Sequence, residues 1–274
     1  MAVRLDRLLH GVLDELRIHP VRKRVRALHG DTAVVDSTHA VIVWEPRRVV
    51  ASYAVPVDDV AASLVPYAGP VPDPPAARPG RPLLLDPRVP FGVHLGAGTP
   101  LTLRGDAFEL PGAAFRSDDP DLAGHVLLDW DAFTTWLEED EPVMGHPHDP
   151  FDRIDCRRSS RHVVVAHGGH VLADTTRATF LFETPLPTRF YIPREDVRMD
   201  LLTPSESTTV CAYKGRASYW SATLGGESLP DIAWSYEQPL LDAEPVKDHL
   251  AFFDERLDVT LDGQRLARPV TPWS

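Results

Sequence analysis

The chain has 274 residues, a formal net charge of −12, 43% hydrophobic residues and 25% charged residues. This is the composition of an ordinary globular protein with room for one or two domains. The excess of acidic residues disfavours nonspecific nucleic-acid binding, which requires a basic surface, so we expect no nucleic-acid partner.

The first residues predict a short amphipathic helix, because apolar residues at three- and four-residue spacings mark one face between residues 2 and 16. We assign residues 1–20 to this N-terminal helix, which ends before Pro20. Packing on the main body is favoured, and binding to a partner is the alternative. The segment lacks an apolar run long enough for a signal peptide or a membrane span, so we expect a cytoplasmic location and no membrane partner.

The rest of the chain repeats itself. HGDTAVVDSTHAVIVWE (29–45) aligns without gaps with HGGHVLADTTRATFLFE (167–183). VPVDDV (55–60) then parallels IPREDV (192–197), and LPGAAF (110–115) parallels LPDIAW (229–234). One order of landmarks occurs twice, which indicates duplication of a whole domain. We assign residues 21–145 to a first, degenerate domain, 146–158 to a polar linker and 159–274 to a second domain carrying the site.

Each copy predicts β-strands. RHVVVAHGGHVLADTT (161–176) has two apolar runs around a glycine turn, as in a hairpin. Helical periodicity is considered in only two places, at the N-terminus and over residues 131–140. Nine prolines between residues 66 and 90 remove strand donors and predict an extended excursion without a helix or central strand.

The second copy resembles the domain-of-unknown-function family 427 over about residues 159–262. The resemblance is carried by YIPREDV (191–197) and by C-x-Y-K-G-x-A-S-Y-W (211–220). The family is sometimes labelled nucleotidyltransferase-like. The resemblance implies a mainly β fold class: two tandem β-tent-like domains of curved antiparallel sheets, after the short N-terminal helix. The zinc-binding cysteines of other β-tent proteins are missing, and we predict no metal site.

The two copies differ in one stretch of equal length. FGVHLGAGTPLTLRG (91–105) in the first copy aligns without gaps with CAYKGRASYWSATLG (211–225) in the second. Chemical groups found only in the second copy are candidates for function. The replacements in the first copy are Phe91 for Cys211, Val93 for Tyr213, His94 for Lys214, Thr99 for Tyr219 and Pro100 for Trp220. We expect Phe91, Leu95 and Pro100 to fill the corresponding space in the first copy.

Lys214 and Cys211 are the candidate catalytic residues. The chain has three lysines against twenty-five arginines, so a lysine here is unusual. Lys214 would bind an anionic group or relay a proton, and Cys211 would be a nucleophile or a pocket wall. The alternatives are a solvated loop lysine and a core cysteine. Burial would lower the pKa of Lys214, and a carboxylate such as Asp196 or Glu183 would raise it.

Tyr191, Tyr213 and Tyr219 are candidate ligand-binding walls, since tyrosines combine an apolar ring with a polar tip. Asp174 and Glu183 are either ligand-binding carboxylates for acid–base chemistry or Mg²⁺, or hydrogen-bonding residues of a turn or sheet. Asp36 and Glu45 repeat them in the first copy and favour the second interpretation. His167 and His170 are also weighed as metal ligands, without an obvious third.

The expected function is that of a small-molecule enzyme with its pocket in the C-terminal copy. A non-catalytic ligand-binding or scaffolding module is the alternative, and nucleotidyl transfer is a further one, which the family label alone suggests. The sequence leaves the cofactor and oligomeric state open. Cys156 and Cys211 form no CxxC motif; one disulfide stays open, although reduced thiols are favoured without an export signal.

Overall fold

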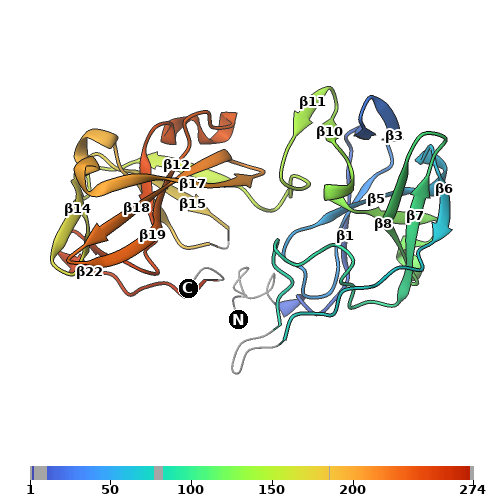
Figure 1. Ribbon diagram of the computed structural model, residues 1–274, viewed down its shortest axis with the longest axis horizontal. Coiled ribbons are helices and arrows are strands. Elements are labelled where there is room, and N and C mark those ends of the chain that lie inside the picture. Colours follow the sequence, from blue (N-terminus) through green and yellow to red (C-terminus); the bar gives the residue numbers. More distant parts are fainter. Residues whose placement is uncertain (1, 3–10, 77–82, 185, 272–274) are drawn as a thin grey trace. The chain divides into compact units, whose positions relative to one another are not determined.

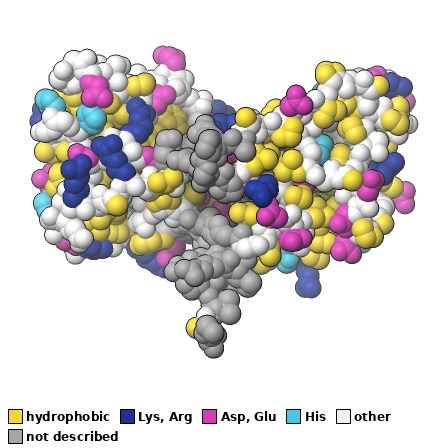
Figure 2. All heavy atoms as spheres, turned by 90° about the horizontal axis from the view of Figure 1, so that it is seen from below, with side chains coloured by type: hydrophobic (Ala, Val, Ile, Leu, Met, Phe, Trp, Pro, Cys, Tyr) yellow, Lys and Arg dark blue, Asp and Glu magenta, His cyan; other side chains and the backbone are white. Residues whose placement is uncertain are grey.

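The computed structural model describes residues 2, 11–76, 83–184 and 186–271, and these residues are mainly β-strand (Figure 1). By its contacts the chain divides into residues 1–147, here unit 1, and 148–274, here unit 2. Charged side chains of both signs are scattered among apolar ones on the visible face of each unit (Figure 2). The described residues include no helix long and apolar enough to cross a membrane.

In its described residues, unit 1 contains strands of three to nine residues and three short 3-10 helices. Its strands are β1 (Arg17–Pro20), β2 (Val25–His29), β3 (Thr32–Ser37), β4 (Val41–Trp44), β5 (Ser52–Pro56), β6 (Ser63–Pro66), β7 (Gly98–Arg104), β8 (Glu109–Ser117), β9 (His125–Leu128), β10 (Thr135–Glu138) and β11 (Glu141–Val143). Its 3-10 helices are η1 (Val57–Asp59), η2 (Pro120–Leu122) and η3 (Trp130–Ala132).

Unit 2 has a similar set of elements. Its strands are β12 (Ile154–Arg158), β13 (Val163–His167), β14 (His170–Thr175), β15 (Thr179–Glu183), β16 (Arg189–Tyr191), β17 (Leu202–Cys211), β18 (Gly215–Leu224), β19 (Glu227–Ser235), β20 (Leu250–Phe252), β21 (Asp258–Leu261) and β22 (Gln264–Arg265). Its 3-10 helices are η4 (Arg194–Asp196), η5 (Met199–Leu201) and η6 (Leu241–Val246).

The strands of the two units follow the same order. Unit 1 has the sheets β1-β4-β5-β9-β8-β7-β6 and β11-β10-β2-β3, and unit 2 has β12-β15-β16, β17-β18-β19-β20 and β14-β13-β21-β22. In unit 2, β16 continues to β20 through reciprocal backbone hydrogen bonds between Ile192 and Leu250, of 2.8 and 2.9 Å. With that bridge, every strand of unit 1 has a counterpart in the same place in unit 2.

The hairpin predicted over 161–176 is confirmed as β13 and β14. Three successive valines favour an extended backbone, and Gly168 and Gly169 both have positive φ, which a tight two-residue turn requires. The register pairs Val163 with Thr175 and shifts at a bulge after Val165. The β2–β3 hairpin of unit 1 has the same pairing and a bulge at the corresponding place, after Ala27.

β15 separates two hydrophobic clusters of unit 2. Leu181 packs with Tyr191, Trp234 and Tyr236, while Phe180 belongs to a larger cluster. Successive side chains of a strand point to opposite faces, so Glu183 lies on the face of Leu181 and Phe182 on the face of Phe180. One short strand therefore supplies residues to two different environments.

The sequence indicates helical patterns at the N-terminus and at residues 131–140, and the structure describes only the second in full. Of the helix assigned to residues 1–20, residues 1 and 3–10 lie outside the described residues. Residues 12–14 form a turn, and residues 17–20 form β1, which pairs with β4. The helical pattern at 131–140 was wrong, because residues 135–138 form β10 between β2 and β11. There Trp136 and Glu138 are buried at a spacing of two, and long-range strand pairing outweighs local helix preference.

The sequence predicts two connecting segments, the linker and the proline-rich segment, and the linker contains a strand in the structure. Residues 154–158, assigned to the linker, instead form the edge strand β12 beside β15. The strand was not predicted because only one of its faces packs inward, which leaves its sequence largely polar. Between 67 and 90, the described residues contain no helix and no strand beyond an isolated bridge at Leu85, as nine prolines predicted.

Candidate functional site

Lys214 is placed by a tight hairpin turn in unit 2. Residues 212–214 connect β17 to β18, Cys211 pairs with Gly215, and the carbonyl oxygen of Lys214 accepts a hydrogen bond from the Leu240 amide at 3.1 Å. Gly215 has φ +99°, a conformation that L-residues rarely adopt. The turn directs Lys214 inward, and the residue is only 7% exposed.

Replacing Gly215 by alanine is expected to destabilise the protein by about 1–3 kcal/mol, because the positive φ strains an L-residue. The added Cβ would also lie 3.3 Å from the carbonyl oxygen of Gln238. Urea unfolding measures the loss. Gly96→Ala is the control, since Gly96 has open space around it and no positive φ, and an equal loss in both variants would contradict the prediction.

The ammonium of Lys214 forms a buried ion pair with Glu183, the last residue of β15. Nζ lies 2.6 Å from Oε2, and the two side chains are 9% and 7% exposed. Burial lowers the pKa of Lys214, but Cys211, Glu183 and Tyr191 together raise it by more, so the net shift is upward. Lys214 is therefore a permanent cation at neutral pH. Asp196, the other carboxylate considered, bonds Thr175 and Arg177 instead.

Two buried tyrosines border this ion pair. The hydroxyl of Tyr191 accepts a hydrogen bond from Trp234 Nε1 at 3.1 Å, and Tyr191 is 1% exposed. Burial raises the pKa of Tyr191 and of Tyr236 well above the ordinary value, so both phenols are neutral at physiological pH. Their buried rings surround the ion pair with a low-dielectric environment.

The other two candidate tyrosines have partners elsewhere. The Tyr213 hydroxyl accepts a hydrogen bond from the Asp149 amide at 3.1 Å, and its ring stacks on His148. The Tyr219 hydroxyl lies 2.8 Å from Thr209 Oγ1, across the β17–β18 hairpin. Tyr213 therefore borders the segment that enters unit 2, whereas Tyr219 lies farther along the hairpin.

The segment that leads into unit 2 contains Asp152, a residue that was not predicted from the sequence as part of the site. The pKa of Asp152 is raised to about 7, mainly by burial and also by Glu183 and Asp149, while Lys214 opposes the shift. Its Oδ1 is buried and has no hydrogen-bond partner in the described part of the chain. An aspartate in a polar, proline-bearing segment carries no signal of this kind, because the shift depends on residues that only folding brings close.

Both cysteines are free thiols near Lys214. Cys211 ends β17 and is half-buried; across the described residues its thiol bonds no histidine or carboxylate that would act as its base. Cys156 lies on β12, and its Sγ donates to the Asp242 carbonyl oxygen at 3.8 Å. Burial and Asp155 raise the pKa of Cys156, whereas Lys214 lowers it. Cys156 is therefore a protonated thiol at neutral pH.

Asp174 does not join this cluster. It lies on β14, and its exposed carboxylate accepts a hydrogen bond from His162 Nε2 at 2.6 Å. Asp36, at the same hairpin position in unit 1, binds Arg24 in the same manner. Asp174 and Glu183 thus have separate partners on different sheets. His167 bonds Glu227, and the described residues contain no group of three potential metal ligands.

Unit 1 has a related hydrogen-bonded pair at the matching place. His94 Nδ1 lies 2.9 Å from Glu45 Oε1, with both side chains buried. The His94 ring stacks on Phe115 and contacts Phe91 edge-on, so aromatic rings fill this space. The expected role of Phe91 agrees with these contacts, whereas Leu95 and Pro100 are only partly buried.

One detail of the comparison between copies was wrong. β7 pairs Pro100 with Phe115, and β18 pairs Tyr219 with Trp234, so Pro100 corresponds to Tyr219 rather than to Trp220. The cause is a one-residue offset between the loop and the strand, which a gap-free alignment misses.

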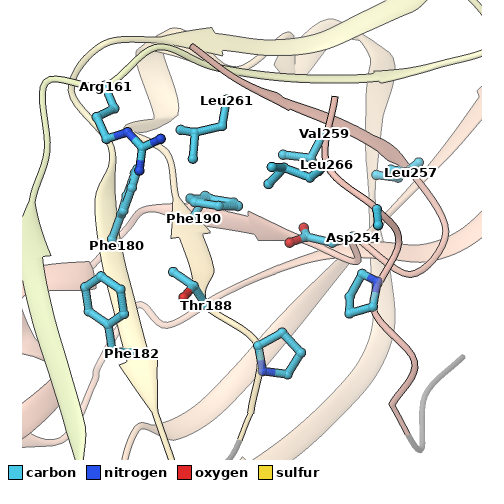
Figure 3. A pocket seen from close by; sticks show the side chains of 13 residues that line it. Arg161, Phe180, Phe182, Thr188, Phe190, Asp254, Leu257, Val259, Leu261 and Leu266 are labelled. Atoms are coloured by element: carbon cyan, nitrogen blue, oxygen red, sulfur yellow. The ribbon is translucent and has the colours of Figure 1, made fainter. Parts of the chain in front are cut away.

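The structure shows a cavity in unit 2 whose walls differ from the predicted ones. A cavity of about 300 Å³ does lie in unit 2, but it opens on the other face of β15, among Phe180, Phe182 and Phe190 (Figure 3). Tyr191, Tyr213 and Lys214 do not line it, and Tyr191 packs with Leu181 on the opposite face of β15.

Unit 2 is thus an antiparallel β unit with a buried cluster of ionisable groups around Lys214. In comparison with known families, the model described as Domain of unknown function (DUF427) matches residues 155–263. The match lies wholly within unit 2 and includes Glu183 and Lys214 but not Asp152. No curated protein matches the chain.

Proposed function

We propose that unit 2 is a small-molecule enzyme that transfers a proton at the cluster of Lys214, Glu183 and Asp152. The proposal rests on Asp152. One oxygen of its carboxyl group is buried without a hydrogen-bond partner among the described residues, and its pKa of about 7 is influenced by the buried pair of Lys214 and Glu183. A general acid or base works best when its pKa is near the working pH. Perturbed carboxyl groups of this kind concentrate at functional sites.

The other residues take complementary roles in this proposal. Lys214 keeps its charge, so it is suited to stabilising a developing oxyanion and unsuited to acting as an amine nucleophile. Glu183 holds the ammonium in place at 2.6 Å. Tyr191 and Tyr236 lower the local dielectric. The substrate class that fits is a small carbonyl or carboxylate compound that gains or loses a proton.

We also propose that unit 1 is a degenerate copy of unit 2 and that both have the β-tent fold. The shared strand order, the matching hairpin registers and the Glu45–His94 pair support duplication. Unit 1 has Phe91 where unit 2 has Cys211, and Val93 where it has Tyr213. A cytoplasmic, reducing location fits two free cysteines.

A non-catalytic ligand-binding module is the second candidate, and one observation favours it: Glu183 already satisfies Lys214, and unit 1 keeps a similar pair. Under this alternative Asp152 binds without exchanging a proton with substrate. Nucleotidyl transfer finds no support in the geometry, since Asp174 and Glu183 do not form the carboxylate pair that would hold Mg²⁺.

The test is an activity screen with Asp152→Asn. Purified full-length protein is incubated in deuterated water with a panel of small carbonyl and carboxylate compounds, and mass spectrometry records deuterium incorporation or consumption. The expected result is turnover by the wild type that Asp152→Asn lowers at least about a hundredfold, the scale of acid–base catalysis. Asp155→Asn, at an exposed neighbouring aspartate, should leave turnover intact.

Folding of the variant is checked by its stability as a function of pH. The folded-state pKa of Asp152 lies above its unfolded value of 3.8, so ionisation costs the folded state stability as pH rises from about 4 to 7. Asp152→Asn should therefore melt higher than wild type at pH 8 and equally at pH 4. Turnover that Asp152→Asn leaves unchanged would rule out the proton-transfer role, and binding without turnover would favour the second candidate.

A further inference from the structure

The cavity on the other face of β15 is a separate environment from the Lys214 cluster. Its volume is about 300 Å³, at the lower end for ligand pockets, which span roughly 300–1,000 Å³. Figure 3 shows its walls, which come from β15, β16, β21 and the segment after β22. They are mostly apolar: Phe180, Phe182, Phe190, Leu257, Leu261 and Leu266. Such walls suit a small apolar molecule.

The lining also contains a buried ionisable group, the carboxyl group of Asp254. Asp254 is 9% exposed, and among the described residues its carboxyl group is held only by its own backbone amide. In Figure 3 the carboxyl group faces the ring of Phe190, within the lining. A buried carboxylate without a paired cation is costly, so a ligand that supplies a cation would bind favourably.

The nearby cations are already engaged elsewhere. Arg189 makes two hydrogen bonds to Glu255, at 2.6 and 3.0 Å, and Arg161 at the rim bonds Asp262 at 2.6 Å. Burial raises the pKa of Asp254 to about 7; Arg189 opposes this shift and Glu255 adds to it. Neither arginine forms an ion pair with Asp254 within the described residues, so above about pH 7, where the carboxyl group is mostly ionised, its negative charge has no paired cation.

We propose that this cavity binds a small apolar amine, whose ammonium pairs with Asp254 while its hydrocarbon or aromatic part packs among Phe180, Phe182 and Phe190. An ammonium gains from aromatic faces as well as from a carboxylate. A carboxylate ligand would meet Asp254 with like charge. The inference concerns a second site and does not depend on the proposed enzyme function.

The test compares three probes of one shape on the full chain at pH 8: 2-phenylethylamine, 2-phenylethanol and phenylacetate. NMR titration measures each Kd and identifies the perturbed residues. The amine should bind at least about tenfold more tightly than the alcohol, with shifts at Phe182 and Leu266, and phenylacetate should bind weakest. Amine affinity should be about tenfold lower at pH 6 than at pH 8, because Asp254 is then mostly protonated.

Two variants separate charge from shape. Asp254→Asn should remove the preference for the amine, while Asp200→Asn, an exposed aspartate paired with Arg198, should keep it. Phe182→Ala, at a side chain 43% exposed, should weaken the amine and alcohol together without unfolding the chain. Equal binding of amine and alcohol by the wild type, tighter binding of phenylacetate, or no shift at the cavity residues would each overturn the proposal.

Discussion

Replacing Lys214 by methionine is expected to lower the free energy of unfolding of unit 2 by about 3–5 kcal/mol, the range for removing one partner of a buried ion pair. Methionine keeps much of the aliphatic part of the lysine side chain. The Glu183 side chain, which is only 7% exposed, then remains buried without its counter-charge. The folded-state pKa of Lys214 is above its ordinary value of 10.5, so the pair's contribution is fully present at neutral pH and is lost only as strongly alkaline pH deprotonates the lysine.

Urea unfolding measures the loss, and hydrogen exchange resolved by peptide assigns it to unit 2. Lys247→Met is the matched control: its ammonium lies 3.9 Å from Glu244, both side chains are about half exposed, and a change within about 0.5 kcal/mol is expected. Adding Glu183→Gln to Lys214→Met should recover part of the stability, because no unpaired charge remains. A Lys214→Met protein as stable as wild type would contradict a structural role for the pair.

Arg189→Met is expected to cost a similar amount, about 3–5 kcal/mol. Arg189 binds Glu255 through two hydrogen bonds, and the side chains are 9% and 0% exposed. Thr271 Oγ1 donates a third hydrogen bond to Glu255 at 2.7 Å, and the guanidinium lies 5.5 Å from the Trp234 ring centre. Without Arg189, the Glu255 carboxylate keeps Thr271 and its own backbone amide but has no counter-charge from Arg189.

The same substitution should change the acid sensitivity of unit 2. Burial raises the pKa of Glu255, but its bonds to Arg189 and Thr271 lower it by more, so the net pKa is below the ordinary 4.5. The resulting stability is present above about pH 4.5 and is lost as pH falls through the folded-state pKa.

Urea midpoints between pH 3 and pH 7 test the Arg189 prediction. The wild type should lose stability below pH 4.5 more steeply than Arg189→Met. Arg198→Met, which removes an exposed pair with Asp200, is the control and should behave as wild type. A cost below about 1 kcal/mol would mean that methionine packing offsets the lost pair and that the pair contributes no net stability.

Local patterns predicted the strands better than the edges and connections. The β13–β14 hairpin follows from consecutive valines and a double glycine, and these signals act within a few residues. β10 and β12 were missed because strand pairing with distant residues decides them. The same distinction explains the site: Lys214 was recognised as an unusual residue on a glycine turn, whereas Asp152 looked like ordinary linker.

The sequence by itself determined that the chain is mainly β, that one order of landmarks occurs twice, and that Lys214, Glu183 and Tyr191 merit attention. Tertiary structure alone decided that Glu183, thirty-one residues away, is the partner of Lys214 and that Asp174 is not. It also placed the cavity on the Phe180 face of β15 rather than on the Tyr191 face. The physical reason is that burial, ion pairing and the resulting pKa depend on which distant side chains share one face of a sheet, and that depends on strand register.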